Sequence, residues 1–405
     1  MYLKGSGSNS RFNFFATFNG LVFLLCVLFA SVADLLAQDF KQVHPGVEYA
    51  QVDHMIGVDQ VKINLLRLDL TKVGLEVRHA FDRAIGLETT SSIATRRNAV
   101  AAINGGFFRL DESEFAGDAA GLLVIDGKFV SDSTKARIAL VFGSHKKGSI
   151  ILDFDHYEVR PGIYPSTFGG PRLAGINRER KPGEAILFSP EFGKSTMTKS
   201  AGTEVVLSDC RKSFCRRIEV LENSNNTQIP RKGFVISIDV DHSENETFAT
   251  KLKALVRGPR KYRFVQVEPF TIPPEWGPLI GTAGFYMIAG VPQLIRGGKI
   301  DITWEQEKAS RAFVFNRHPR TAVAKLKDGK FLMLTVDGRR PGVSVGMNLP
   351  ELAEYLLSLG AVDAMNLDGG GSTTMFLDGK VVNQPSDPNG ERKVGDALIV
   401  TLRNK

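Results

Sequence analysis

The chain has 405 residues, of which 43% are apolar and 23% charged, and this balance predicts a folded protein with one large core or two smaller ones. Lys and Arg exceed Asp and Glu by seven, yet no run of five or more basic residues occurs, so a nucleic-acid-binding function has no support. A mildly basic surface is compatible with a small anionic substrate.

Residues 1–33 predict a secretory signal peptide. Lys4 and Arg11 are its only charges, an apolar core runs from Leu21 to Ala30, and Ser31-Val32-Ala33 supplies small residues at the minus-three and minus-one positions of a cleavage site. The alternative is an uncleaved membrane anchor, but the apolar run is shorter than the roughly 20 residues of a spanning helix. We therefore expect a secreted or periplasmic protein with no stable membrane span once the leader is removed.

Residues 34–99 predict a β-rich N-terminal segment, with a clear strand at 61–68. The apolar run 99–103 then stops at Asn104-Gly105-Gly106, and Asp126-Gly127 is typical of a two-residue hairpin turn. Both stretches favour short strands joined by tight turns.

The stretch 157–274 is less regular, and we interpret it as an inserted region or peripheral lobe. Cys210 and Cys215 lie here with four residues between them, which in an exported protein predicts a local disulfide. A zinc site is the alternative, but no histidine stands nearby to complete four ligands. Asn225 and Asn245 begin N-x-T sequons, which matter only in a host that glycosylates.

After residue 320 the pattern predicts a strand–helix–strand unit. Strands at 322–327 and 330–336 are joined by a turn, a helix follows between Asn348 and Gly360, and a further strand covers 361–367. The strands on either side of the helix should be parallel, with a right-handed crossover. A hairpin around Asp378-Gly379 is expected next.

Two of these strands end in an aspartate followed by glycine, at Asp337-Gly338-Arg339 and at Asp368-Gly369. Ligands collect beyond the carboxyl ends of parallel strands, so we expect Asp337, Arg339 and Asp368 to approach one crevice. The earlier Asn104-Gly105-Gly106 segment is similar to 365–370, and the two glycine loops could face each other across that site.

The segment 366–374, Asn-Leu-Asp-Gly-Gly-Gly-Ser-Thr-Thr, is the strongest candidate for chemistry. Three glycines allow close approach of a ligand, and the Ser and Thr residues add donors for an anion or a sugar. The loop lacks the lysine of a nucleotide P-loop and the G-x-S-x-G pattern of a serine hydrolase. Ser372 as a nucleophile would need a base, and of the seven histidines only His318 lies in the C-terminal region that contains this loop. The other alternative is a plain tight turn.

With its neighbours, this loop resembles the phosphodiester glycosidase family. The resemblance covers roughly residues 100–402 and is most specific from Arg320 to Arg392, whereas Gln384 stands where an arginine is frequent in the family. The segments that carry it are 104–108, 320–322, 336–339, 349–353, 366–374, 383–386 and 391–392.

The resemblance implies hydrolysis of a sugar that is joined through its anomeric carbon to a phosphodiester. Asp368 is then the first catalytic candidate and Asp337 the second, as base or nucleophile, while arginines hold the phosphate. The arginines have an alternative as structural ion-pair partners of the same aspartates. The substrate-binding candidates are Arg320, Arg339, Arg392, Asn104, Gly105, Asn366, Gly369, Gly370, Gly371, Ser372 and Thr373.

We therefore expect an α/β (α+β mixed) fold: a mixed β-sheet core with one strand–helix–strand unit, several hairpins and glycine loops at strand ends. The predicted domains are 1–33, 34–99 and 100–402. The expected partner is a glycan or sugar phosphate, with no nucleic acid. No cofactor is required, although Asp337 and Asp368 could hold a divalent cation such as calcium. Alternative functions are a glycosidase acting on phosphate-free polysaccharide and a non-catalytic glycan-binding envelope protein.

Overall fold

The fold is given by a computed structural model that describes residues 1–2, 39–133, 137–144, 150–157, 159, 161–164, 173–211, 214–241, 243–257, 265–269, 276, 279 and 282–403. The predicted leader lies outside the described residues. One compact unit runs from Phe40 to Lys405. Within the described residues, no helix is long and apolar enough to cross a membrane.

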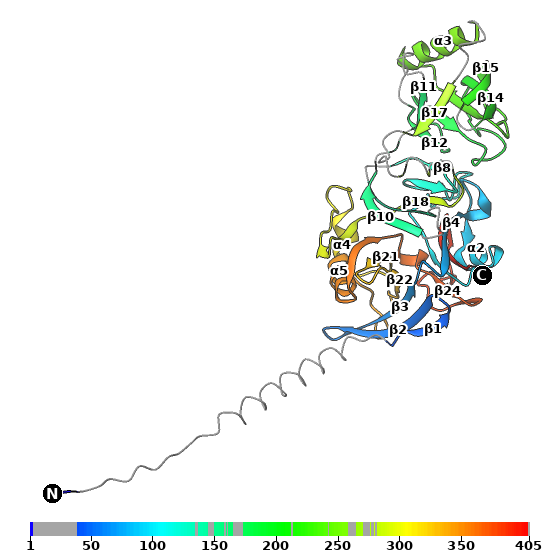
Figure 1. The fold of residues 1–405 in the computed structure, drawn as a ribbon. Coiled ribbons are helices and arrows are strands. Elements are labelled where there is room, and N and C mark those ends of the chain that lie inside the picture. The colour runs from blue at the N-terminus through cyan, green and yellow to red at the C-terminus, as the bar shows by residue number, and fades with distance from the viewer. Residues whose placement is uncertain are drawn as a thin grey trace. The chain divides into compact units, whose positions relative to one another are not determined.

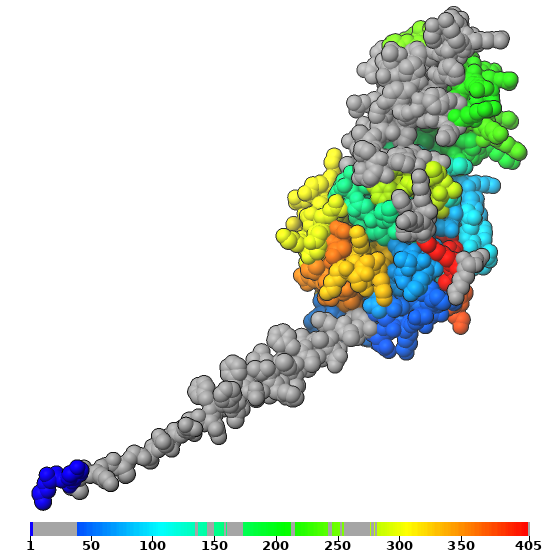
Figure 2. All heavy atoms as spheres, viewed as in Figure 1, coloured from blue at the N-terminus to red at the C-terminus, as the bar shows by residue number. Residues whose placement is uncertain are grey.

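The largest sheet joins strands from the two ends of the unit, and each strand is antiparallel to its neighbours. In Figures 1 and 2 the blue N-terminal strands accordingly lie against the orange C-terminal ones. The N-terminal β-rich segment is therefore part of the same sheet as the strand–helix–strand unit. In order across the sheet, the strands are β1 (Lys41–His44), β2 (Val47–Ile56), β3 (Asp59–Leu68), β22 (Phe331–Val336), β21 (Arg320–Leu326), β23 (Ala361–Asn366), β19 (Gln293–Arg296) and β20 (Lys299–Ile300).

Strand β22 is buried along its whole length because both faces of the sheet are covered. Phe331 and Met333 enter one hydrophobic core, whereas Leu332 and Leu334 enter another. An uninterrupted apolar run is therefore compatible with a strand whose side chains alternate between two cores.

Helix α5 (Leu349–Ser358) covers the second of these cores. A capping box between Asn348 and Glu351 begins the helix, and Gly360, with φ 85°, follows its end. Strands β22 and β23 are both antiparallel to β21, which lies between them, so they run in the same direction. The predicted parallel relationship is confirmed, although the sequence pattern did not indicate that β21 lies between these two strands.

A second, five-stranded sheet positions both glycine loops. Strand β6 leads into Asn104-Gly105-Gly106 and pairs on one side with β24 and on the other with β27. Helix α2 (Thr90–Arg96) packs on this sheet through Ile93 and Ala94. The order is β25 (Lys380–Val381), β24 (Met375–Leu377), β6 (Ala101–Asn104), β27 (Asp396–Leu402) and β4 (Val73–His79).

Two further large sheets accompany these, besides a two-stranded pair near the second sheet. One contains β10 (Ile150–His156), β9 (Ile138–Ser144), β18 (Phe285–Ala289), β7 (Leu123–Ile125) and β8 (Lys128–Ser131). The other lies within the irregular stretch 157–274 and has its own core. Its members are β11 (Pro161–Tyr164), β17 (Val265–Pro269), β15 (Phe214–Ser224), β14 (Gly202–Arg211), β16 (Phe234–Ile238), β13 (Ala185–Phe188) and β12 (Gly175–Ile176), accompanied by α3 (Ser243–Arg257).

The predicted disulfide joins Cys210 to Cys215, which face each other across the β14–β15 hairpin with their Cα atoms 3.9 Å apart. Of the two sequons, Asn225 is exposed, whereas Asn245 is buried and donates to the carbonyl oxygens of Gly183 and Asp239. Asn225 is therefore the more accessible sequon.

The expected balance of helix and strand was only partly right. The described residues are mostly strand, the helices are few, and β12–β13 is the one parallel pair among the described ladders. The predicted hairpins at Asp126-Gly127, 328–329 and Asp378-Gly379 are confirmed. Helix content was overestimated because the mixed α/β interpretation extended one strand–helix–strand unit to the whole chain.

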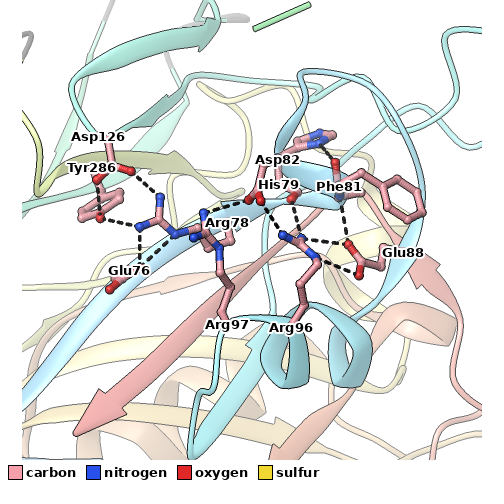
Figure 3. Close-up of polar contacts among 11 residues, drawn as sticks. Glu76, Arg78, His79, Phe81, Asp82, Glu88, Arg96, Arg97, Asp126 and Tyr286 are labelled. Carbon is pink, nitrogen blue, oxygen red and sulfur yellow. Dashed lines mark hydrogen bonds and ion pairs between the residues drawn. The ribbon is translucent and has the colours of Figure 1, made fainter. Parts of the chain in front are cut away.

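A network of ion pairs fixes the segment that follows β4 (Figure 3). Phe81 and Asp82 both have a left-handed backbone, with φ of 53° and 55°. Arg96 pairs with Asp82 and Glu88, and Arg97 also reaches Asp82. Glu88 and Thr89 form β5, which pairs with β26 (Lys393–Val394) just before β27. The network therefore supports the segment between β4 and β5, next to the five-stranded sheet that contains β6 and β27.

Candidate active site

The two glycine loops meet through Asn104, a fully buried residue at the end of β6. Its Nδ2 donates to the carbonyl oxygen of Asp368 (2.7 Å), and its Oδ1 accepts from Thr321 Oγ1 (2.7 Å) and the Thr374 amide (3.1 Å). The Asp368 amide in turn donates to the carbonyl oxygen of Gly105 (3.1 Å). The expectation that the loops face each other is confirmed, and Asn104 forms the joint between them.

Asp368 lies two residues after the end of β23 and keeps part of its surface accessible, although protein atoms surround its carboxyl group. Burial raises the pKa of Asp368 to about 6, against the opposing effects of Ser372, the Gly369 amide and the positive charge of Arg392. The Gly369 amide donates to Asp368 Oδ1 over 2.9 Å. The pKa of this carboxyl therefore suits a base or nucleophile near neutral pH.

A second carboxylate, Asp396, is near enough to Asp368 for the charge of Asp368 to raise its pKa, and it was missed in the sequence. It begins β27, is 1% exposed, and its Oδ1 accepts from the Gly106 amide (2.8 Å). Burial, with a smaller contribution from the charge of Asp368, raises its pKa to about 7 against the opposing effect of the Gly106 hydrogen bond. The available signal was an acidic residue at the head of the apolar run 397–400.

Arg339 provides a free cation at the glycine loop. It is exposed and has a left-handed backbone with φ 62°, which is uncommon for a residue with a side chain. A β-carbon at Gly370 would lie 2.9 Å from Arg339 Nη2, so the guanidinium group rests against the loop. Among the described residues, no hydrogen-bond or ion-pair partner of Arg339 occurs, which leaves its charge available for a ligand.

Arg392 reaches the same loop from the segment before β26. Its Nε donates to Asp387 Oδ2 (2.7 Å), while a β-carbon at Gly371 would lie 2.3 Å from Nη2. Its positive charge lowers the pKa of Asp368, against the larger effect of burial. Two arginines from different parts of the chain therefore flank one glycine loop.

Asp337 is joined to the loop through Asn383 and has a structural role. It is 2% exposed, and its carboxylate accepts from Asn383 Nδ2 and the Gln384 amide at 3.1 Å each. Asn383 Nδ2 also donates to the carbonyl oxygen of Thr373. Burial raises the pKa of Asp337 despite these hydrogen bonds. The carboxylate thus holds the 383–384 segment against the loop.

Arg320 is buried and bound to backbone carbonyls. Nε donates to Met347 (2.9 Å), and Nη2 donates to Phe313 (2.7 Å) and Asn316 (2.9 Å), where Phe313 belongs to α4 (Arg311–Phe315). Burial and the charge of Arg339 lower the pKa of Arg320 to about 10. No ion pair with Asp337 or Asp368 forms, and two of its three nitrogens are committed to the framework.

His318, like Arg320, lies close enough to Arg339 to be affected by its charge. In the sequence it was considered only as a possible base for Ser372 and was not included among the site residues. It is half-buried, and its pKa is lowered by burial and by the charges of Arg320 and Arg339. The imidazole is therefore neutral at pH 7. Its place directly before Pro319-Arg320 was the available signal.

Several buried polar atoms of the glycine loop have no hydrogen bond of good geometry within the described part of the chain. They are Asn366 Oδ1 and the hydroxyls of Ser372, Thr373 and Thr374. The Ser372 hydroxyl is close enough to Asp368 to lower the pKa of that carboxyl group, yet it forms no hydrogen bond that meets the usual geometric limits. Such unpartnered groups are rare in folded proteins and are typical of a site that a ligand or water completes.

The remaining predicted residues form the frame of this site. Asn366 Nδ2 donates to the carbonyl oxygens of Val291 (2.8 Å) and Leu367 (2.6 Å). Gly370 begins the 3₁₀ turn η5 (Gly370–Ser372) with φ 59°, and its amide donates to the carbonyl oxygen of Pro319 (2.9 Å). Gly369 also lies against this carbonyl. In the described residues, no group of three or more His, Cys, Asp or Glu side chains could hold a metal ion.

The fold and this site define a mainly antiparallel β-sheet protein. Its glycine loop carries the acid Asp368 and is flanked by two arginines, Arg339 and Arg392. Residues 222–401 match the family described as phosphodiester glycosidase. The resemblance to this family is confirmed over the matched residues.

Relatives with this domain include N-acetylglucosamine-1-phosphodiester alpha-N-acetylglucosaminidase of Bos taurus, 41% identical over 110 residues, which are 25% of this chain and 20% of the relative. The Homo sapiens enzyme of the same name is 38% identical over 111 residues, 25% of this chain and 21% of the relative. The chain thus matches about a fifth of the length of these curated relatives.

Solved structures share the fold over a longer range. A hypothetical protein from Synechocystis has a TM-score of 0.69 at 21% identity and covers 91% of this chain and 64% of its own. A protein from Burkholderia pseudomallei K96243 has a TM-score of 0.67 at 22% identity, with 86% and 75% covered. At these identities the similarity is one of fold.

Proposed function

We propose that the protein hydrolyses glycosyl-1-phosphodiesters at the anomeric carbon. The observation that carries this proposal is Arg339, an exposed guanidinium group without a described partner, held against the glycine loop that begins at Asp368. The match of residues 222–401 to the phosphodiester glycosidase family and the names of the relatives favour the same substrate class. An N-acetylglucosamine-1-phosphodiester is therefore the first substrate to test.

The phosphate has two arginines to bind it. Arg339 and Arg392 can each offer paired N–H groups to phosphate oxygens, and the Ser372 and Thr373 hydroxyls add further donors. A phosphate group neutralised in this way leaves readily, so a strong general acid is not needed. Arg320 contributes mainly by holding the carbonyl oxygens of the surrounding backbone.

The reacting carbon is served by Asp368, which acts as base for water or as nucleophile. In the overall step, the bond between the anomeric carbon and the phosphate oxygen breaks, water supplies a hydroxyl group to the sugar, and a phosphomonoester departs. Asp368 is partly accessible and its pKa is about 6, so it is ionised at neutral pH and able to accept a proton.

The position of cleavage is tested by hydrolysis in oxygen-18 water. We expect the label on the anomeric hydroxyl of the released N-acetylglucosamine and none on the phosphomonoester, both measured by mass spectrometry. Label on the phosphate would reveal attack at phosphorus, and Asp368 and Asp337 would then need another role, as metal ligands.

Two other functions remain as outcomes of the same assay. A phosphate-free p-nitrophenyl glycoside serves as the matched substrate. Turnover of this compound that is unaffected by Arg339→Lys would indicate an ordinary glycosidase. Binding of the phosphodiester that leaves it intact during long incubation would indicate a glycan-binding protein without catalysis.

We propose that no cofactor is required. The carboxylate of Asp337 already accepts hydrogen bonds from Asn383 and Gln384, so it is poorly placed to share a calcium ion with Asp368. Dialysis against a chelator should leave turnover unchanged, and loss of activity that calcium restores would contradict this proposal.

We also propose export of the protein through the predicted leader 1–33. The Cys210–Cys215 disulfide supports this location because such bonds persist in oxidising compartments. Fractionation of cells that express the full chain, with N-terminal sequencing of the product, tests the proposal. A cytoplasmic product that retains residues 1–33 would oppose it.

A further inference from the structure

The dipeptide Gly105-Gly106 is hydrogen-bonded to two aspartates, to the backbone of Asp368 and to both the backbone and the carboxyl group of Asp396. On one side, the amide of Asp368 donates to the carbonyl oxygen of Gly105 (3.1 Å). On the other, the Gly105 amide donates to the carbonyl oxygen of Asp396 (2.9 Å), and the Gly106 amide donates to Asp396 Oδ1 (2.8 Å). A β-carbon at Gly105 would lie 1.9 Å from Asp396 Oδ1, so only glycine permits this approach.

The two acids have unequal surroundings. Asp396 is 1% exposed and forms no ion pair with a described residue, so a negative charge there is poorly solvated. Asp368 keeps partial access to solvent and lies near the positive charge of Arg392. Of the two groups, Asp368 is therefore the one that carries a negative charge at the lower free-energy cost.

We propose that Asp396 is a positioning residue that acts through Asp368: the two carboxyl groups carry one proton in the working pH range, and it resides on Asp396. This inference rests on the proposed function for its catalytic meaning. Its physical content, a coupled carboxyl pair, does not depend on the substrate.

The charged groups around the pair agree with this arrangement. Burial raises the pKa of Asp396 to about 7, above that of Asp368 at about 6, and the charge of Asp368 contributes to the difference. His79 on β4 is the strand partner of Asp396, but burial lowers its pKa to about 4, so it is neutral. Asp82 and Glu88 are paired with Arg96 (Figure 3).

A single proton on Asp396 has a consequence for an anionic substrate. While Asp396 is neutral, the pair carries one negative charge, and the arginines can attract the phosphodiester. When Asp396 ionises, a second buried charge appears beside Asp368 and repels that substrate. The alkaline limb of the pH profile should therefore belong to Asp396 and the acid limb to Asp368.

The test compares the pH profiles of kcat/KM for the wild type and Asp396→Asn. Asparagine can still accept the Gly106 hydrogen bond, so the backbone arrangement has a conservative replacement. Two pH units above a pKa near 7, a single ionisation reduces wild-type activity about a hundredfold. Asp396→Asn should lose this alkaline limb and keep the acid limb. The matched control is Asp118→Asn, because burial also raises the pKa of Asp118 to about 7; this variant should retain both limbs.

A second measurement does not require activity. Carbon-13 NMR of the aspartate carboxyl groups should show Asp396 titrating at lower pH in Asp368→Asn, since the neighbouring charge is removed. An unchanged Asp396 titration, or an alkaline limb that persists in folded Asp396→Asn, would overturn the proposal. If the wild type cleaves no glycosyl phosphodiester, the proposed function fails, and the NMR titration still decides whether the pair exists. If Asp396→Asn does not fold, Asp368→Asn decides the question.

Discussion

Asn104 donates from Nδ2 to the carbonyl oxygen of Asp368 over 2.7 Å, although 264 residues separate the two. The same asparagine accepts from Thr321 and Thr374, so it fixes the position of Asp368 through the backbone and makes no hydrogen bond to the carboxyl group. Asn104 therefore positions the glycine loop, whereas the carboxyl group of Asp368 is the proposed reacting group. Substitutions at the two residues can test these roles independently.

Replacement of Asp368 by asparagine should reduce kcat by about a hundredfold or more, the scale of removing a general base, while the fold is retained. The new side chain can still accept from the Gly369 amide through its oxygen. Asp363→Asn is the matched control because Asp363 lies on the same strand and its Oδ1 accepts from the Gly297 amide. Turnover of a glycosyl phosphodiester and thermal melting are the measurements. A fully active Asp368→Asn would remove Asp368 from the mechanism.

Arg339→Lys should lower kcat/KM on phosphodiesters about a hundredfold even though the charge is kept, since lysine lacks the planar pair of donors. Steady-state kinetics measure this effect, and Arg216→Lys provides an exposed arginine of the β14–β15 hairpin as control. If Arg339→Lys matches the wild type, the phosphate is bound elsewhere.

Asp337→Asn should act mainly on stability. Two hydrogen-bond donors, Asn383 Nδ2 and the Gln384 amide, converge on the buried carboxylate, and an asparagine would turn an NH₂ group toward one of them. We expect a loss of about 1–3 kcal/mol in the free energy of unfolding, measured with urea at pH 7, together with partial activity. A variant of wild-type stability that is as inactive as Asp368→Asn would instead make Asp337 a catalytic residue.

The raised pKa of Asp396 also predicts how stability depends on pH. Its folded-state pKa, about 7, exceeds the usual value of 3.8, so the folded protein binds this proton more tightly than the unfolded chain. The resulting stability is fully present below pH 4 and is lost as the pH rises to about 7. Asp396→Asn should therefore gain melting temperature relative to the wild type between pH 4 and pH 8. A constant difference across this range would indicate an ordinary folded-state pKa.

Removal of the disulfide by Cys210→Ser and Cys215→Ser together should leave catalysis nearly unchanged. The bond closes only a short hairpin, so it restricts the unfolded chain little and contributes about 2 kcal/mol at most. Urea unfolding and phosphodiester turnover are the measurements. Intact mass after alkylation of the exported wild type should show no free thiol at these two positions. Loss of turnover in the folded double variant would link the hairpin to the site.

Local pattern was sufficient for the elements whose signals lie within a few residues. The turns Asp126-Gly127 and Asp378-Gly379, the helix between Asn348 and Gly360, and the cysteine pair all depend on neighbouring residues, and all are confirmed. The glycine loop was likewise recognisable because its motif is contiguous.

The tertiary structure decided which of the candidate side chains are available to bind a ligand and which are held by other protein groups. Arg320 and Arg339 look equivalent in sequence, but Arg320 is committed to buried carbonyls, whereas Arg339 is exposed beside Gly370. Asp396 was recognised as a candidate only from the structure, in which β6 pairs with β24 on one side and with β27, the strand that begins at Asp396, on the other. The physical reason is that burial and neighbouring charge set the pKa of a carboxyl group, and both depend on strands that are distant in sequence. The sequence by itself therefore determined the elements and the motif, and the pairing of distant strands determined the state of each acid and base.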